Sequence, residues 1–169
     1  VLVTAGATVE PIDRIRLITQ ARAGRTGCRI AAAFSAAGHT VRLLTSSPER
    51  AVADSGLPMQ TCPGLEVRGY RTFDELRDQM AAALRPGGGF HALVHAAAVG
   101  DYHCAGAYRS PTPGSPDCGP QEFVAAAPGA GRSEPELWLR LVRAPDLTEM
   151  VRPVWGFAGV MAIFAGSAG

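Results

Sequence analysis

Short apolar runs recur along the chain, and each has the length of a β-strand. The first covers Val1 to Val3 and stops at Ala5-Gly6, as expected for a buried strand that ends in a tight turn. Further runs fall at residues 40–44, 65–70 and 92–95, and later at residues 137–142 and within residues 154–164. We expect a strand in each.

Amphipathic stretches with helical periodicity separate the first strands. Residues 28–37 repeat apolar side chains every three or four positions and stop at Gly38. Thr72 and Glu75 form a capping box for a helix that runs to Leu84. Shorter helices are expected at residues 48–54 and from Pro145-Asp146 to Met150. This order favours an α/β fold with a doubly wound, mostly parallel sheet.

Two groups of small residues mark a candidate ligand site. Gly24 and Gly27 bracket Arg25 just before a predicted helix, so a close backbone approach and a helix N-terminus would coincide. Small residues also follow the run at residues 92–95, up to Asp101. Ligands bind beyond the carboxyl ends of such strands, so both groups should face one pocket, where Asp101 could hold a ribose or a polar substrate group. The alternatives are that the glycines only form turns and that Asp101 is solvated or caps a helix.

Residues 103–134 contain few aliphatic side chains and many Pro, Gly and Ala residues. They predict a long irregular flap within a single domain that covers residues 1–169. The apolar stretch at residues 154–165 is shorter than the ~20 residues of a membrane-spanning helix, and no leader pattern is visible. We therefore expect a core strand there and no membrane partner.

All sixteen basic residues are Arg, and the absence of Lys narrows the possible chemistry. It excludes a P-loop lysine, a Schiff-base lysine and the Tyr-x-x-x-Lys pair of short-chain dehydrogenases. A formal charge of +1 gives no argument for a nucleic-acid partner. The four cysteines are widely spaced, which favours a reduced cytoplasmic protein over a disulfide scaffold.

Several residues suggest other kinds of site, each with weak support. His91, His95, His103 and Cys104 are zinc-ligand types, but the first two flank a strand and no acidic partner completes a set, so we expect no protein-bound metal. No Gly-x-Ser-x-Gly elbow indicates a hydrolase, and no Gly-x-Gly-x-x-Gly follows the first strand. Trp138 is interpreted as a packing residue.

Four segments in order resemble phosphopantothenate–cysteine ligase, the C-terminal domain of the bifunctional coenzyme A biosynthesis flavoprotein. They are VLVTAGATVEPIDRIRLIT at the start, the Gly-Arg-x-Gly turn, HAAAVGDY and LVRAPDL, and the resemblance extends to about Phe157. It implies a three-layer Rossmann-like fold, usually dimeric. It also implies a reaction in which CTP or ATP, with Mg²⁺, activates the carboxylate of 4'-phosphopantothenate for attack by cysteine.

The resemblance also assigns site residues. Catalytic roles fall on Gln20 and Arg25. Nucleotide contacts fall on Gly6, Ala7, Thr8, Gly24, Gly27, Ala96, Ala97, Asp101, Pro145, Asp146, Leu147 and Phe157, with Phe164 competing for the aromatic position. The resemblance also implies two partners, which are a second copy of the chain and a flavin-dependent decarboxylase, fused or separate.

The sequence departs from the family pattern in three places. Gln20 stands where the family has a catalytic Asn, Arg22-Ala23 replaces its Ser-Ser pair, and the flap has Arg109 and Arg132 but no Lys. The family's last strands and their nucleotide-contacting lysines would lie beyond Gly169. Three hypotheses stay open: an active ligase, a nucleotide-binding or assembly module without activity, and a related ligase for another carboxylate.

Overall fold

The computed structural model describes residues 1–21, 24–56, 62–109, 124–125 and 136–164. The chain divides into two compact units, which we describe separately. The sheet unit comprises Val1–Val9, Thr19–Gly100 and Asp146–Gly169, and the ribbon unit comprises Glu10–Ile18 and Asp101–Pro145. The single domain expected over residues 1–169 stays a prediction.

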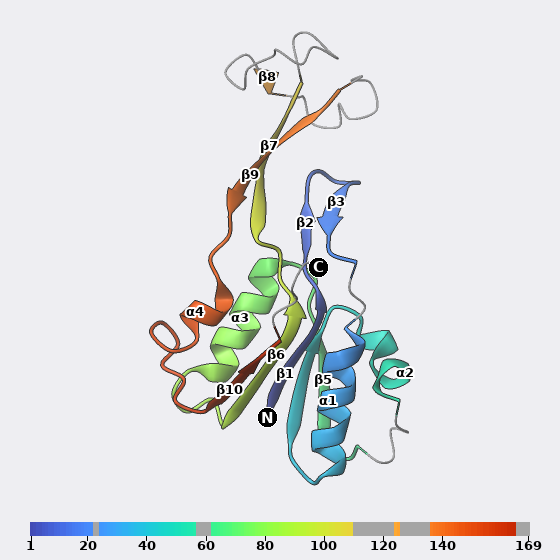
Figure 1. Ribbon diagram of the computed structural model, residues 1–169, viewed down its shortest axis with the longest axis vertical. Helices are drawn as coiled ribbons and strands as arrows, with labels where there is room; N and C mark the ends of the chain where they lie inside the picture. The colour runs from blue at the N-terminus through green and yellow to red at the C-terminus, as the bar shows by residue number, and fades with distance from the viewer. Residues whose placement is uncertain (22–23, 57–61, 110–123, 126–135, 165–169) are drawn as a thin grey trace. The chain divides into compact units, whose positions relative to one another are not determined.

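Five parallel strands form the centre of the sheet unit (Figure 1). In spatial order they are β10 (Val160–Ile163), β6 (Ala92–Ala98), β1 (Leu2–Ala7), β4 (Val41–Thr45) and β5 (Leu65–Gly69). The predicted α/β fold with a parallel sheet is therefore confirmed, and five of the predicted strands lie in it. All residues of β1 are buried, because this strand lies in the middle of the sheet.

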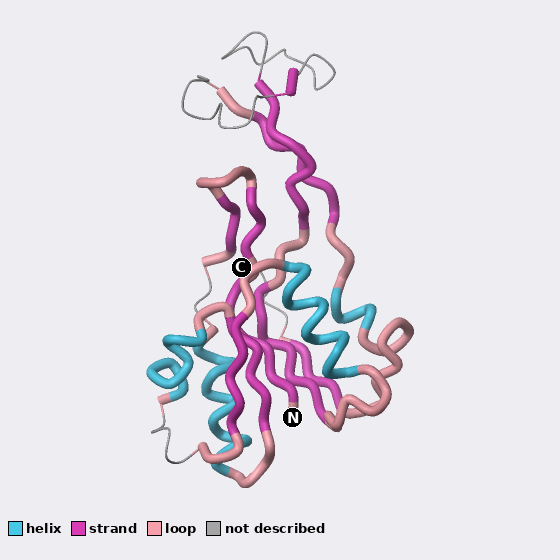
Figure 2. The backbone as a smooth tube through the Cα atoms, turned by 180° about the vertical axis from the view of Figure 1, so that it is seen from behind, coloured by secondary structure: helices cyan, strands magenta, loops and turns pink. Residues whose placement is uncertain are grey.

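The helices connect the strands and cover the sheet. They are α1 (Arg25–Ala36), α2 (Ala51–Ser55) after the 3-10 turn η1 (Pro48–Arg50), α3 (Phe73–Leu84) and α4 (Leu147–Met150). The chain moves outward from β1 to β5 and then returns past β1 to β6. Right-handed crossovers therefore put α1 and α3 on opposite faces, and Figures 1 and 2 show the sheet between them.

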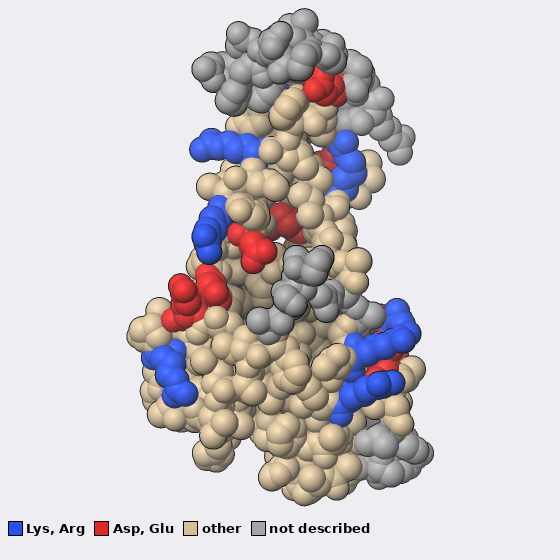
Figure 3. Space-filling view, in the orientation of Figure 1, with Lys and Arg blue, Asp and Glu red and all other residues tan. Residues whose placement is uncertain are grey.

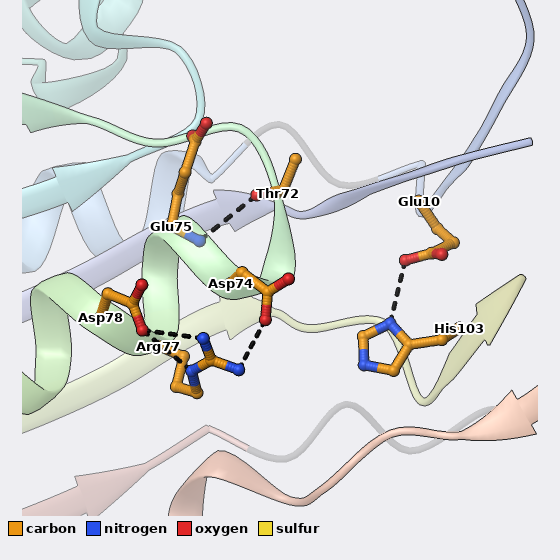
Figure 4. Close-up of polar contacts among 7 residues, drawn as sticks. All are labelled: Glu10, Thr72, Asp74, Glu75, Arg77, Asp78 and His103. Atoms are coloured by element: carbon orange, nitrogen blue, oxygen red, sulfur yellow. Dashed lines mark hydrogen bonds and ion pairs between the residues drawn. The ribbon is translucent and has the colours of Figure 1, made fainter. Parts of the chain in front are cut away.

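The N-terminus of α3 confirms the predicted capping box, with one difference. Thr72 Oγ1 accepts the Glu75 N–H at 3.3 Å, whereas the Glu75 carboxylate reaches back to the N–H of Arg71, at 2.6 Å, rather than to that of Thr72. Arg77 then bridges Asp74 and Asp78 at 2.6 and 2.9 Å, as Figure 4 shows. The start of α3 is thus fixed by polar contacts close in sequence.

Large aliphatic side chains fill the interior of the sheet unit. The fully buried ones come from β1, β4, β6, α3, α4 and the residue after α4: Leu2, Val3, Val41, Leu43, Leu44, Leu76, Met80, Leu93, Leu147 and Val151. Phe73, Leu76, Met80 and Leu84 form a buried stripe along α3. No helix within the described part of the chain is long and apolar enough to cross a membrane.

The ribbon unit is built from antiparallel strands. Strand β7 (Tyr102–Arg109) pairs with β9 (Trp138–Arg143) and with the short β8 (Val124–Ala125). Strands β2 (Val9–Pro11) and β3 (Leu17–Thr19) form a hairpin. At its tip the Asp13 carboxylate accepts the N–H groups of Ile15 and Arg16 at 2.8 and 2.7 Å and pairs with the Arg16 guanidinium.

One prediction for this part of the chain was wrong. Residues 103–109 were expected to be irregular, but they form most of β7, because pairing with β9 supplies backbone hydrogen bonds that the local sequence does not reveal. The strand expected at residues 137–142 is confirmed as β9, which pairs with β7 in the ribbon. Residues 110–123 and 126–135 of the expected flap, including Arg132, lie outside the described residues.

Candidate functional site

The carboxyl end of the sheet brings several predicted site residues together. Strands β1 and β6 are direct neighbours, with Gly6 opposite Ala97 and Ala7 opposite Ala98. The chain order reverses between these two strands, since β4 and β5 follow β1 on one side and β6 and β10 lie on the other. Such a switch point at the carboxyl ends of parallel strands is where α/β sheets bind ligands.

Glycines at this edge permit a close approach of the backbone. Gly24 has φ +76°, and a Cβ there would lie 2.5 Å from the Gly6 nitrogen. A Cβ at Gly27 would lie 2.6 Å from the Ala5 Cβ. Only glycine fits at either position without displacing β1. The glycines predicted to form a turn therefore also allow α1 to begin directly against the end of β1.

Helix α1 begins at this edge with Arg25, after Gly24 as its N-cap. Gly24 has no side chain to cap the helix, and the N–H groups of a first helical turn have no partner within the helix. These donors and the helix dipole favour an anion at this point. Arg22 and Ala23, which precede the turn, lie outside the described residues.

The loops that follow β1 and β6 are tied to each other. Buried Thr8 accepts the Gly100 N–H on its Oγ1 at 2.8 Å, and its own N–H donates to the Ala98 carbonyl at 3.1 Å. Gln20 Nε2 donates to the Val99 carbonyl at 2.8 Å. The predicted residues Thr8 and Gln20 are thus brought to the end of β6.

Arg25 lies at the same edge beside an acidic side chain. Its Nε is 3.6 Å from Oδ1 of the nearly buried Asp54, which Arg50 also approaches at 3.7 Å. The Arg25 side chain is 67% exposed, so the pair contributes little to stability but restricts the guanidinium. On the face shown in Figure 3, charged side chains form small groups rather than one continuous patch.

Asp146 and Leu147 begin α4. Asp146 is the N-cap, and its Oδ1 accepts the Thr148 N–H at 2.8 Å and the Thr148 hydroxyl at 2.7 Å. These hydrogen bonds hold the pKa of the Asp146 carboxyl below its usual value. Leu147 is buried and anchors the turn in the core. Asp101 and Pro145 belong to the ribbon unit, where the Asp101 carbonyl accepts the Ala144 N–H at 2.8 Å.

Phe157 does not lie with the other predicted site residues of the sheet unit. It precedes β10, is buried, and its ring is next to Gly159, which lies against the His91 carbonyl at the amino end of β6. Phe164 instead follows the carboxyl end of β10, donates its N–H to the His95 carbonyl at 2.9 Å and is 52% exposed. The two phenylalanines are therefore at opposite ends of the strand, and Phe164 is the one at the carboxyl edge of the sheet.

Three polar residues support this edge although the sequence reasoning gave them no role. Ser46, just after β4, accepts the Ala7 N–H at 3.1 Å. Tyr70, just after β5, donates to the Ala5 carbonyl at 2.8 Å, and burial raises the pKa of its phenol. The Thr4 hydroxyl is hydrogen-bonded to Nδ1 of the buried His95. For Ser46 and Tyr70 a useful signal would have been their position just after a strand, where α/β proteins gather polar side chains.

The candidate site thus consists of backbone donors and small residues at the carboxyl ends of β1 and β6. Among the described residues, no three His, Cys, Asp or Glu side chains are grouped so that they could hold a metal ion.

In the ribbon unit, Glu10 joins β2 to β7. His103 Nδ1 lies 3.1 Å from Glu10 Oε2 (Figure 4). The Cys104 N–H donates to Glu10 Oε1 at 2.8 Å.

Comparison with known proteins shows the family to which the chain belongs. Residues 1–110 match the family model described as the DNA/pantothenate metabolism flavoprotein C-terminal domain. No curated protein sequence matches the chain significantly.

Solved structures share the fold at low sequence identity. The DNA/pantothenate metabolism flavoprotein from Streptococcus pneumoniae is 23% identical with a TM-score of 0.68, and the match covers 95% of this chain and 66% of that one. The C-terminal domain of the coenzyme A biosynthesis bifunctional protein CoaBC is 17% identical with a TM-score of 0.60, covering 95% and 60%. A Cab2 mutant in complex with phosphopantothenate-cysteine is 15% identical with a TM-score of 0.58, covering 95% and 61%. The chain therefore spans less than two thirds of the length of these proteins.

Proposed function

The chain belongs to the family of the DNA/pantothenate metabolism flavoprotein C-terminal domain, and from this premise we propose that it is a phosphopantothenate–cysteine ligase domain. In the proposed reaction, the carboxylate of 4'-phosphopantothenate attacks the α-phosphate of CTP or ATP and releases pyrophosphate. The amine of cysteine then attacks the acyl carbon, an amide forms and the nucleoside monophosphate leaves. Positioning and charge neutralisation supply most of the catalysis in such a reaction.

One observation carries the proposal: Gly24 and Gly27 hold the N-terminus of α1 against the end of β1, beside the switch point to β6. This arrangement offers backbone donors to phosphates at the edge where α/β sheets bind ligands. We assign phosphate contacts to Gly6, Ala7, Thr8, Gly24 and Gly27, and further nucleotide contacts to Ala96, Ala97, Asp146 and Leu147. Asp101 and Pro145 keep the nucleotide-binding role that the family resemblance implies.

The aromatic contact to the nucleotide base is assigned to Phe164 instead of Phe157. Phe164 follows β10 at the same end of the sheet as Ala96 and Ala97, and its side chain is exposed. Phe157 is part of the core at the other end. Mg²⁺ would be held by the nucleotide's phosphates, since no three metal-ligand side chains are grouped among the described residues.

Gln20 and Arg25 are proposed to act on the acyl intermediate. The Gln20 amide donates one N–H to the Val99 carbonyl, which holds it at the end of β6 and leaves its carbonyl oxygen and second N–H for a ligand. Arg25 is a fixed cation at the start of α1, directed by Asp54. A shorter Asn at position 20 would place the amide differently.

The proposal extends to partners and compartment. A second copy of the chain would cover apolar side chains of the ribbon, where Tyr102, Trp138, Leu141 and Val142 are each 44–52% exposed. A flavin-dependent decarboxylase, fused or separate, would act in the step next to the ligase reaction, either supplying its substrate or consuming its product. The reduced cysteines Cys28, Cys62 and Cys104 fit a cytoplasmic enzyme.

A turnover assay tests the ligase reading. The chain is incubated with 4'-phosphopantothenate, cysteine and either CTP or ATP, and pyrophosphate release is measured with and without cysteine. We expect release with one of the two nucleotides and amide formation only with cysteine. No pyrophosphate from either nucleotide, with a chain that is folded by circular dichroism, would contradict the proposal.

The Gln20→Asn variant sharpens the catalytic assignment. If the amide at position 20 stabilises the acyl intermediate, the shorter side chain of the family pattern should raise kcat, by roughly tenfold for each 1.4 kcal/mol of transition-state stabilisation gained. Gln79→Asn, a change of the same kind on α3, is the control and should leave the rate unaltered. An unchanged rate in Gln20→Asn would show that this position does not limit the reaction.

The departures from the family pattern favour a second function. Gln20 in place of Asn and a flap sequence without Lys are expected of a nucleotide-binding or assembly module that has lost turnover. Calorimetric titration with CTP and ATP separates the two, because the module would bind a nucleotide without releasing pyrophosphate. Turnover with a different carboxylate alone would instead support a related ligase.

A further inference from the structure

A buried polar pair joins β1 to β6 beneath the proposed nucleotide site. Thr4 is fully buried and His95 is 5% exposed, and the two residues face each other in the register of the parallel strands. Thr4 Oγ1 lies 2.8 Å from His95 Nδ1. Polar side chains this deep in a sheet are costly unless each is satisfied, so their hydrogen bonds define one arrangement.

The hydrogen bonds around Thr4 determine which group donates. Its Oγ1 accepts the N–H groups of Ala96 and Ala97, each at 3.2 Å. A hydroxyl has one proton and two acceptor positions, and both acceptor positions are then in use. The Thr4 hydroxyl must therefore donate to His95 Nδ1, and the single imidazole proton resides on Nε2.

A charged imidazole would not fit this network. Protonation would place a third donor against the Thr4 oxygen and leave the hydroxyl proton without an acceptor. Burial lowers the pKa of His95 to about 4, while Asp146, at the start of α4, acts in the opposite direction. His95 is therefore neutral near pH 7, and its tautomer is set by Thr4.

We propose that Thr4 and His95 are positioning residues that fix the Ala96–Ala97 backbone of the nucleotide site. This inference rests on the proposed function, in which Ala96 and Ala97 contact the nucleotide. The two residues reach the ligand through those backbone groups and not directly, because both are buried. His95 holds the hydroxyl in the one rotamer that leaves its acceptor positions to Ala96 and Ala97.

The test compares variants of the full chain by two measurements. Thr4→Val removes the hydroxyl at nearly constant volume, and Thr4→Ser keeps it. Ser35→Ala is the control, because Ser35 is an equally buried hydroxyl on α1 with no hydrogen-bond partner in the structure. Hydrogen exchange at the Ala96 and Ala97 amides is followed without ligand, and the Kd of CTP and of ATP is measured by calorimetry.

In Thr4→Val we expect faster exchange at both amides and a nucleotide Kd raised roughly tenfold, as the loss of one hydrogen bond worth about 1.4 kcal/mol would produce. Thr4→Ser and Ser35→Ala should stay near wild type. His95→Gln should weaken binding similarly, and its combination with Thr4→Val should be no worse than either change alone, because both disrupt one network.

The outcomes separate this inference from the proposed function. A wild-type chain that binds neither nucleotide overturns the proposed function and the positioning role together. A wild-type chain that binds, with a Thr4→Val variant that binds equally well, overturns the positioning role alone, even if amide exchange is faster. Additive losses in the double variant would also overturn it.

Discussion

The central sheet and the ribbon use the same element, a β-strand, in opposite environments. All six residues of β1 are buried, whereas β9 leaves every residue except Leu139 exposed. The central strands β1, β4 and β6 are largely buried under the helices and packed with aliphatic side chains, so burial stabilises them. The ribbon depends on antiparallel pairing and on polar contacts such as Glu10 with His103. One region is suited to hold a precise site, and the other to present a surface.

The largest expected difference comes from removing matched leucines. Leu93 on β6 is 1% exposed and Leu141 on β9 is 44% exposed. Leu93→Ala should lower the free energy of unfolding by about 2–5 kcal/mol, because it leaves a cavity in a packed core. Leu141→Ala should cost less than about 1 kcal/mol. Urea denaturation followed by circular dichroism measures both; equal losses would contradict the contrast between sheet and ribbon.

The sheet should also carry the stronger pH dependence, through His95. Burial lowers its pKa from 6.5 to about 4, so between these values the unfolded chain binds more protons than the folded one. Stability should therefore fall as the pH drops from 6.5 to 4, by up to about 3 kcal/mol, and this contribution should level off below pH 4.

The pH effect is measured as the difference between wild type and His95→Gln in urea denaturation at several pH values. Asp146 is the charged group that acts on His95 and is kept in both proteins, as are the carboxyls that titrate in the same range. Parallel stability curves for the two proteins would show that His95 does not carry the effect.

Alanine variants of two glycines should show a smaller effect. Their comparison distinguishes the cost of a positive φ from the cost of close packing at Gly24. Gly24 and Gly56 have nearly the same φ, +76° and +72°, but only Gly24 lies against another backbone, that of Gly6. In both alanine variants the strain of a positive φ should lower the free energy of unfolding by about 1 kcal/mol. Gly24→Ala should cost a further 1–3 kcal/mol or so through overpacking and should weaken nucleotide binding. Thermal unfolding and calorimetry check this; equal effects at the two positions would remove the argument for close approach.

The sequence predicted the sheet well because its signals are local. Apolar runs marked all five strands, and Gly38, Thr72 and Glu75 marked helix ends. Gly6, Gly24 and Gly27 lie at one edge of the sheet, and the sequence marks such close approaches with glycine because a side chain would clash there. The family resemblance then added a ligand that periodicity alone does not name.

The sequence could not predict features that depend on pairing over long distances. Strand β7 has the composition of a loop and becomes a strand only by pairing with β9 some thirty residues later. The choice between Phe157 and Phe164 needed the register of β10 against β6, which sets the end of the sheet that each one occupies. The Thr4–His95 pair likewise joins residues far apart in the chain, so no local pattern reveals it.

The most direct test of the account is a map of where a nucleotide binds. Backbone amide shifts are followed by NMR during titration of the chain with CTP and with ATP. We predict changes at the carboxyl edge, at Gly6, residues 24–27, Ala96, Ala97 and Asp146, and none at the amino end around His91, Phe157 and Gly159. Changes centred on the amino end, or no changes with either nucleotide, would contradict the claim that the carboxyl edge of the sheet is a nucleotide site.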